Sequence, residues 1–113
     1  MTYYHATPKR NVFAIMREGI KPSPLEECVY LCDTEQGALQ FMVVKRALGI
    51  TEYAVIPVEL EEDTVEPSTD HDPRYFNGAK AFIHKGAIPS ELVPSELDKI
   101  KLYVLEERED TEQ

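Results

Sequence analysis

Apolar and polar residues follow one another along the chain in patterns that separate strand-like from helix-like segments. The strand-like segments are rich in apolar, β-branched and aromatic residues, and the last of them alternates Ile100, Leu102 and Val104 with Lys101 and Tyr103. These patterns predict strands at residues 3–6, 29–32, 53–60, 81–84 and 99–106.

Helical spacing of apolar residues first occurs directly after the opening strand. Thr7 is placed to cap the free amides of a first helical turn, and Pro8 suits the first helical position. Gly19 supplies the left-handed residue that commonly ends a helix. The sequence therefore predicts a helix at residues 9–18.

A second helix is predicted between a cap at Asp33 or Thr34 and a stop at Gly49. Further on, Pro57 places the strand of residues 53–60 at a sheet edge or a bulge, because proline cannot donate to a strand ladder. Residues 88–92 indicate a turn or a single helical turn. The element order is then β-α-β-α-β-β-β. Early helices and late strands favour an α+β fold with a largely antiparallel sheet over a doubly wound parallel one.

The apolar positions that recur with these spacings are expected to form the core. They are Val12, Phe13, Met16, Val29, Leu31, Phe41, Ile56, Val58, Phe82, Ile83 and Leu102. Residues 61–74, in contrast, are polar and contain Pro67 and Pro73, which predicts a loop. Long loops in compact domains are usually functional or disordered, so we expect this one to be poorly packed at the rim of a binding cleft, as a lid or recognition loop.

Length and charge narrow the class of protein. The 113 residues, 42% of them apolar, fit one globular domain, expected at residues 1–105 and followed by an acidic tail at residues 106–113. The formal net charge is −9, with 12 basic against 21 acidic residues, which argues against general binding to duplex nucleic acid. No apolar run reaches the roughly 20 residues of a membrane span, and the first residues lack the features of a signal peptide. We therefore expect a cytoplasmic protein that does not engage a membrane.

The two cysteines, Cys28 and Cys32, are expected to be reduced and buried. Residues four apart in a strand are separated by about 13 Å, at roughly 3.3 Å per residue. A disulfide needs Cα atoms within about 7 Å. The three histidines are scattered at positions 5, 71 and 84, so no metal site is expected.

The sequence contains no phosphate-binding loop, Rossmann glycine motif or nucleophile elbow, and a small set of polar residues remains. His5 ends a strand, Thr7 lies on the same side of it, Tyr30 is central in the next strand, and His84 and Lys85 end a later one. Taken singly, these residues are explained as a hydrogen-bonded histidine, a helix cap, sheet packing and solvent-facing side chains. Taken together, they make the turn His5-Ala6-Thr7 the best candidate for a working surface.

Four short runs then follow one another in a particular order and spacing. They are Tyr4-His5-Ala6-Thr7, the helix end Met16-Arg17-Glu18-Gly19-Ile20-Lys21-Pro22, the strand Val29-Tyr30-Leu31-Cys32-Asp33, and the late step Ile88-Pro89-Ser90-Glu91-Leu92. This arrangement resembles the ADP-ribosyltransferase-like superfamily, which includes poly-ADP-ribose polymerases, DarT-type DNA-modifying toxins and RNA 2′-phosphotransferases. The resemblance covers about residues 3–93.

The resemblance implies a split sheet with two early helices and a nucleotide cleft between two small sheets that face each other. It implies that His5 hydrogen-bonds a hydroxyl of the nicotinamide ribose, that Thr7 shapes the amide pocket, and that Tyr30 stacks on the nicotinamide ring. His5 and Tyr30 would then be the catalytic residues, and Ala6, Thr7 and Phe41 would join them in binding NAD. NAD would be the substrate, no metal would be needed, and the acceptor would be an unidentified protein or nucleic acid.

One position departs from the family pattern. The late-strand catalytic glutamate of the DarT-type proteins corresponds to about Lys80 or Ala81, neither of which is acidic, and Glu91 follows the proline. Two functions therefore stay open. One is an NAD-dependent ADP-ribosyltransferase, and the other is a catalytically reduced member that binds a nucleotide or a protein partner, as in a toxin-related or phage-related regulator. RNA phosphotransfer is disfavoured because no matching set of arginines is found, and an unrelated α+β module is also compatible.

Overall fold

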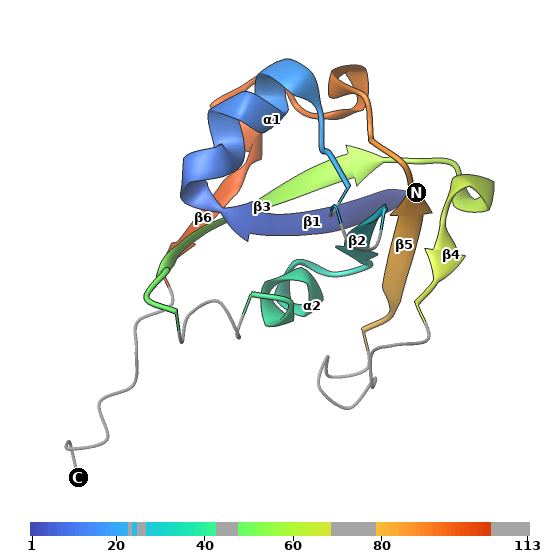
Figure 1. Ribbon diagram of the computed structural model, residues 1–113, viewed down its shortest axis with the longest axis horizontal. Coiled ribbons are helices and arrows are strands. Elements are labelled where there is room, and N and C mark those ends of the chain that lie inside the picture. Colours follow the sequence, from blue (N-terminus) through green and yellow to red (C-terminus); the bar gives the residue numbers. More distant parts are fainter. Residues whose placement is uncertain (23, 25–26, 43–47, 69–78, 105–113) are drawn as a thin grey trace, which may run out of the picture.

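The fold is built on one antiparallel sheet. The computed structural model describes residues 1–22, 24, 27–42, 48–68 and 79–104. Within these residues, six strands form a sheet in the order β4-β5-β2-β1-β3-β6, and every neighbouring pair is antiparallel (Figure 1). The strands are β1 (Thr2–Pro8), β2 (Cys28–Cys32), β3 (Glu52–Glu59), β4 (Glu66–Pro67), β5 (Ala81–Lys85) and β6 (Lys101–Val104). The helices are α1 (Val12–Glu18) and α2 (Glu35–Gln40), with 3-10 turns η1 (Lys9–Asn11), η2 (Glu62–Thr64), η4 (Ser90–Leu92) and η5 (Leu97–Lys99).

The sheet has two halves that meet at a narrow seam. β1 pairs with β3 along its whole length, whereas β1 and β2 are paired only at Tyr4↔Cys32. The expectation of two separate sheets facing each other is therefore wrong for the described strands, because the ladder continues from β2 to β1 through this one pair. The coarser expectation, an α+β fold with an antiparallel sheet, is confirmed.

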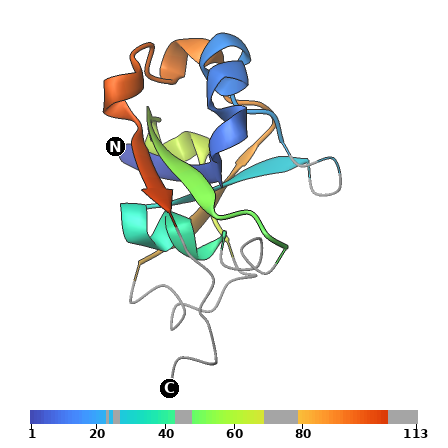
Figure 2. The ribbon, with the colours of Figure 1, turned by 90° about the vertical axis from the view of Figure 1, so that its left-hand side faces the viewer.

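The helices lie on opposite faces of the sheet. Figures 1 and 2 show α1 with the late 3-10 turns on one side and α2 on the other. Two apolar clusters correspond to these faces. The α1-side core contains Tyr3, Val12, Ile15, Ile20, Val29, Leu31, Ala54, Ile56, Val58, Leu60, Val65, Ile88, Val93 and Ile100. The α2-side core contains Ala6, Cys32, Ala38, Met42, Tyr53, Val55 and Ala79.

The first helix begins later than the sequence predicts. β1 runs on through Thr7 and Pro8, which pair with Ala54 and Tyr53 of β3. Thr7 therefore does not cap the helix, and that expectation is wrong. A proline is tolerated there because β1 is paired on one side only at this point. The end of the helix is as predicted, with Gly19 at φ 86°.

Gly19 also permits a close approach of two chain segments. A Cβ built on it would lie 2.3 Å from the carbonyl oxygen of Ile88. Directly afterwards, Ile20 and Ile88 exchange backbone hydrogen bonds of 2.9 Å in each direction. The turn predicted at residues 88–92 is present as this bridge followed by η4.

Of the two residues predicted to cap the second helix, Thr34 is the one that caps α2. The Thr34 hydroxyl accepts a hydrogen bond of 2.9 Å from the Gly37 amide. The helix ends at Gln40, before Gly49, and residues 43–47 lie outside the described part of the chain. Pro57 was expected at a sheet edge or a bulge. It is paired on one side only, because β6 pairs with β3 along Glu52 to Val55 and does not reach Pro57.

The predicted core is right in its centre and wrong at its border. Val12, Val29, Leu31, Ile56 and Val58 are buried. The partly buried members are Met16, Phe41, Phe82 and Ile83. Phe13 and Leu102 are 66% and 49% exposed, so their predicted burial is wrong. On α1, successive side chains point about 100° apart, so the burial of Val12 turns Phe13 away from the core.

The polar segment after β3 has more structure than predicted. It contains η2 and the short strand β4, and Val65 is buried in the α1-side core. Pro67 is exposed, which agrees with the prediction that this segment is poorly packed. The rest of the predicted loop, including Pro73, lies outside the described residues, as does the acidic tail at residues 106–113.

Cys28 and Cys32 are both buried and free, which confirms the prediction of reduced thiols. Burial raises the pKa of the Cys32 thiol. No helix in the described part of the chain is long and apolar enough to cross a bilayer.

Candidate functional site

His5 and Thr7 line the same cavity. It has a volume of about 230 Å³ and lies between β1, α1 and the turn at residues 19–21. Both side chains reach it because residues two apart on a strand face the same side of a sheet. The predicted pairing of these two residues in one site is thus present in the geometry.

The hydrogen bond of His5 fixes the chemical character of its ring. Nδ1 lies 3.0 Å from the backbone carbonyl oxygen of Tyr30 across the seam. A carbonyl oxygen accepts only, so Nδ1 carries the proton and donates. Burial lowers the pKa of His5, with an opposing effect from this hydrogen bond, so the ring is neutral at pH 7. Nε2 is then an acceptor.

Nε2 of His5 is open to a ligand. It has no hydrogen-bond partner among the described residues. No fully buried side-chain nitrogen or oxygen in that part of the chain lacks a partner. Nε2 must therefore keep access to solvent, and it can accept a hydrogen bond from a hydroxyl group.

The Thr7 hydroxyl complements this acceptor. Thr7 is 5% exposed, and its Oγ1 accepts a hydrogen bond of 3.1 Å from Nδ2 of Asn11. The hydroxyl proton stays available, because accepting from Asn11 does not use it. The cavity thus offers both an acceptor and a donor.

A carboxylate that the sequence did not single out completes the cavity. Glu18 lines it, at the end of α1. Lys21 Nζ donates to Glu18 Oε1 at 2.9 Å, and Arg17 Nη2 donates to Oε2 at 3.1 Å. These two hydrogen bonds lower the pKa of Glu18, so it is ionised at neutral pH. In the sequence, the pair Glu18-Gly19 at the helix end could have indicated this residue, because it places a carboxylate one residue before the turn that returns towards β1.

Tyr30, Ala6 and Phe41 lie on the other face of the sheet. The rings of Tyr30 and Phe41 are 5.7 Å apart between centroids, and Phe41 packs against the α2-side core that contains Ala6. Tyr30 alternates with Val29 and Leu31, which belong to the α1-side core. The structure therefore does not bring the Tyr30 ring to the His5 cavity, and the predicted convergence of these side chains is wrong. Tyr30 contributes its backbone carbonyl to His5 instead.

The late-strand pair has ordinary partners. His84 Nδ1 is 3.1 Å from the Gly86 carbonyl oxygen, and Lys85 forms a 3.3 Å ion pair with Glu66. His84 lines a separate cavity beside Glu59. These contacts agree with the plain structural explanation.

Metal-binding side chains do not gather in the part of the chain that the structure describes. No group of three or more His, Cys, Asp or Glu residues is arranged there to hold an ion. His71 is not among the described residues.

Comparison with known proteins adds no relative: no family model matches the chain, and no curated protein sequence matches it.

Proposed function

We propose that this chain is an ADP-ribosyltransferase-like protein that holds the nicotinamide end of NAD in the cavity of His5, Thr7 and Glu18. The observation that carries the proposal is that an acceptor, a donor and a carboxylate line one cavity on the face of α1.

The size of the cavity limits which part of NAD enters it. Ligand pockets for whole drug-sized molecules span about 300–1,000 Å³, whereas this cavity has about 230 Å³. It suits one ring and its attached groups. The remainder of the dinucleotide then lies outside, over the protein surface.

Each polar group has a task in this binding mode. Nε2 of His5 accepts a hydrogen bond from a ribose hydroxyl, and the Thr7 hydroxyl donates to the carboxamide oxygen of nicotinamide. Tyr30 acts through its carbonyl, which holds the His5 ring in the tautomer that leaves Nε2 free. This differs from the stacking role that the resemblance gives to the Tyr30 ring.

Glu18 supplies the negative charge that the reaction needs. In the transfer, the bond between C1′ of the ribose and the nicotinamide nitrogen breaks, and its electron pair goes to the ring nitrogen. A lone pair of the acceptor forms the new bond at C1′, and the acceptor proton passes to solvent. Positive charge develops on the ribose in between, and an ionised carboxylate beside it lowers the barrier. Glu18 would replace the acid missing near Lys80 and Ala81.

A specific observation favours the second candidate function, nucleotide binding without turnover. The Glu18 carboxylate is already held by Lys21 and Arg17, which weakens its interaction with a further positive charge. A catalytically reduced protein would keep the His5 and Thr7 contacts and lack the transfer.

Two measurements test the proposal and separate its two forms. Calorimetric titration with NAD measures binding, and chromatographic detection of free nicotinamide measures cleavage. We expect His5→Ala to weaken NAD binding about tenfold, because it removes a hydrogen bond and leaves a ribose hydroxyl unpaired. We expect Glu18→Gln to leave binding within about twofold and to abolish nicotinamide release.

The matched controls are His84→Ala and Glu91→Gln, which lie outside the cavity and should change neither measurement. Binding without release in the wild-type protein would select the reduced form. Absence of NAD binding at millimolar concentration would refute both forms.

A further inference from the structure

The lining of the His5 cavity divides into a buried floor and an exposed rim. The buried lining residues are Thr7, Ile15, Gly19 and Ile20, and the exposed ones are Asn11, Ala14, Glu18 and Lys21. A ligand that places one ring on the floor must therefore leave the cavity past the rim. Two of the four rim residues, Glu18 and Lys21, are charged, so they decide what the rest of the ligand meets.

The charged part of the rim carries more positive than negative charge. Glu18 accepts hydrogen bonds from Lys21 at 2.9 Å and from Arg17 at 3.1 Å, so two cations share one carboxylate. The other lysine ion pairs set one cation against one carboxylate, as in Lys9–Glu52, Lys85–Glu66 and Lys101–Glu35. The surplus positive charge is thus a local property of the Arg17–Glu18–Lys21 cluster.

Both cations of this cluster can bind a further acceptor. A lysine ammonium and an arginine guanidinium each carry several N–H donors, and Glu18 uses one from each. The side chains of Lys21 and Arg17 are 72% and 68% exposed, so a ligand can reach the remaining donors. Phosphate oxygens form strong charge-assisted hydrogen bonds with both groups.

The covalent structure of a nicotinamide nucleotide brings a phosphate close to this cluster. In the proposed binding mode, a hydroxyl of the nicotinamide ribose meets His5, and its C1′ lies beside Glu18. The phosphate is attached to C5′ of the same ribose, so it is only a few bonds away from the group beside Glu18. Lys21 and Arg17 are bound to that carboxylate and are therefore the cations nearest to the phosphate in this mode.

Local cations are needed because the chain as a whole repels an anion. Its formal net charge is −9. At physiological ionic strength, charges more than about 8 Å from an exposed ligand are largely screened. The charges at the rim therefore decide whether a phosphate is accepted.

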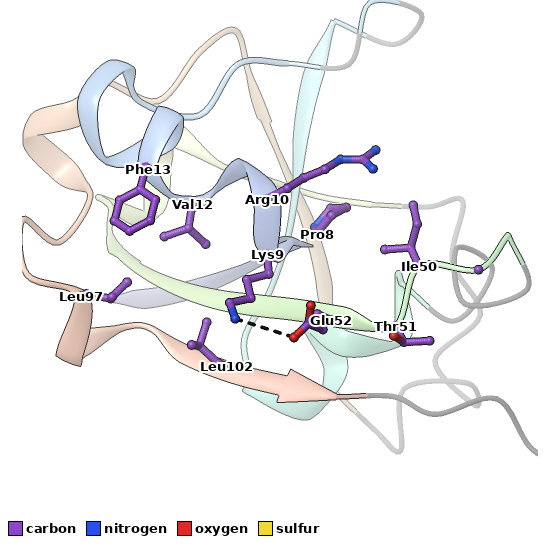
Figure 3. A pocket seen from close by; sticks show the side chains of 11 residues that line it. Pro8, Lys9, Arg10, Val12, Phe13, Ile50, Thr51, Glu52, Leu97 and Leu102 are labelled. Carbon is purple, nitrogen blue, oxygen red and sulfur yellow. Dashed lines mark ion pairs between the residues drawn. The ribbon is translucent and has the colours of Figure 1, made fainter.

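The larger groove of the molecule is less suited to a phosphate. This groove has a volume of about 500 Å³, is lined by Phe13 and Leu102 among others, and shares no lining residue with the His5 cavity. Its Lys9 lies 3.6 Å from Glu52, and Figure 3 draws this ion pair. Figure 3 also shows the Arg10 guanidinium directed away from the apolar side chains. One cation is thus neutralised within the groove, and the other points out of it.

We propose, on the basis of the proposed NAD function, that Arg17 and Lys21 bind the phosphate of the nicotinamide nucleotide and make the site selective for a phosphorylated ligand over the nucleoside. Each side chain keeps its hydrogen bond to Glu18 and donates to a phosphate oxygen with another N–H group. The cluster then holds the ribose from the carboxylate side and the phosphate from the cation side.

Two ligands that differ only in the phosphate test this inference. Nicotinamide mononucleotide and nicotinamide riboside are each titrated into the chain by calorimetry. We expect the mononucleotide to bind about tenfold or more tightly, and this preference to shrink as sodium chloride is raised. The net negative charge of the chain favours the riboside, so a preference for the mononucleotide reports the local cations.

Single substitutions assign the preference to the two cations. We expect Lys21→Gln and Arg17→Gln each to reduce the preference for the mononucleotide several-fold, and the double variant to abolish it. Lys21→Arg keeps a cation and should retain the preference. Lys99→Gln is the matched control, because it removes one positive charge from an exposed residue outside the cavity and should leave the preference unchanged. Thermal unfolding of each variant confirms that it is folded.

The outcomes separate this inference from the proposed function. Equal affinity for the two ligands, with both weakened by His5→Ala, would refute the phosphate-binding role and leave the nicotinamide site standing. An equal loss of preference in Lys21→Gln and Lys99→Gln would also refute it, because total charge would then be the cause. Absence of binding of either ligand and of NAD at millimolar concentration would refute both proposals.

Discussion

At the scale of single residues, the protonation state of His5 connects the candidate site to the stability of the domain. The folded protein holds His5 neutral, because burial lowers its pKa. Nε2 is an acceptor in that state only. Protonation would turn it into a donor and would place a charge in a partly buried position.

This gives a pH dependence of stability with a definite sign. The unfolded chain protonates His5 near its ordinary pKa of about 6.5, whereas the folded chain protonates it at a lower pH. The unfolded state therefore binds more protons between the two pKa values, and stability falls as pH drops below about 6.5 towards the folded-state pKa. Above the pKa of His5 in the unfolded chain, the ring is neutral in both states, and its contribution to the stability of the folded protein is fully present.

We expect His5→Gln to flatten this dependence. Urea unfolding at a series of pH values between about 7.5 and 5.5 measures the free energy of unfolding for the variant and the wild-type protein. His84→Gln is the control, because it replaces a histidine that lies outside the His5 cavity. An unchanged slope in His5→Gln would contradict the buried neutral histidine.

At the scale of elements, the local sequence determines where α2 begins but not where α1 begins. Thr34 is extended at φ −134° and ψ 156°, and its hydroxyl caps the helix. Thr7 and Pro8 have the residue types of a helix start, yet they pair with β3. Pairing with β3 stabilises the extended conformation of these two residues more than a capping hydrogen bond would stabilise a helix start.

The cap of α2 makes a testable contribution to stability. We expect Thr34→Ala to lower the free energy of unfolding by about 1 kcal/mol, because the Gly37 amide loses its acceptor. Thr34→Ser keeps the hydroxyl and should retain most of this stability. Chemical denaturation measures both variants, and equal loss in the two would show that the hydroxyl is not the cause.

At the scale of the whole molecule, the α1-side core and the groove lined by Phe13 and Leu102 differ in how far they bury large apolar residues. Ile56 is fully buried in that core, whereas Phe13 is mostly exposed at the groove. Large apolar residues are thus divided between a buried set in the α1-side core and an exposed set that includes Phe13 and Leu102.

Two truncations measure this division. We expect Ile56→Ala to lower the free energy of unfolding by about 2–5 kcal/mol, because it leaves a cavity in the core. We expect Phe13→Ala to change it by no more than about 0.5 kcal/mol. Urea unfolding of both variants provides the comparison, and a comparable loss in Phe13→Ala would show that this ring packs against the domain.

The sequence by itself determined the elements and the centre of the core, because these follow from local spacing. Period-two and period-3.6 patterns located the two α-helices and the strands other than β4. Gly19 marked the end of α1, and the apolar positions nearest the sheet centre were buried as expected. The order and spacing of short motifs also brought His5 and Thr7 forward as a pair, and they line one cavity.

Only the tertiary structure decided which face each residue occupies. Tyr30 and His5 lie on neighbouring strands, yet the pleat directs the Tyr30 ring to the α2 side while its carbonyl binds His5. Glu18 reaches the cavity because the turn after α1 folds back towards β1. Phe13 and Leu102 remained exposed because no described element covers that end of the sheet. These outcomes depend on strand register and layer packing between residues far apart in the chain, which local periodicity does not encode.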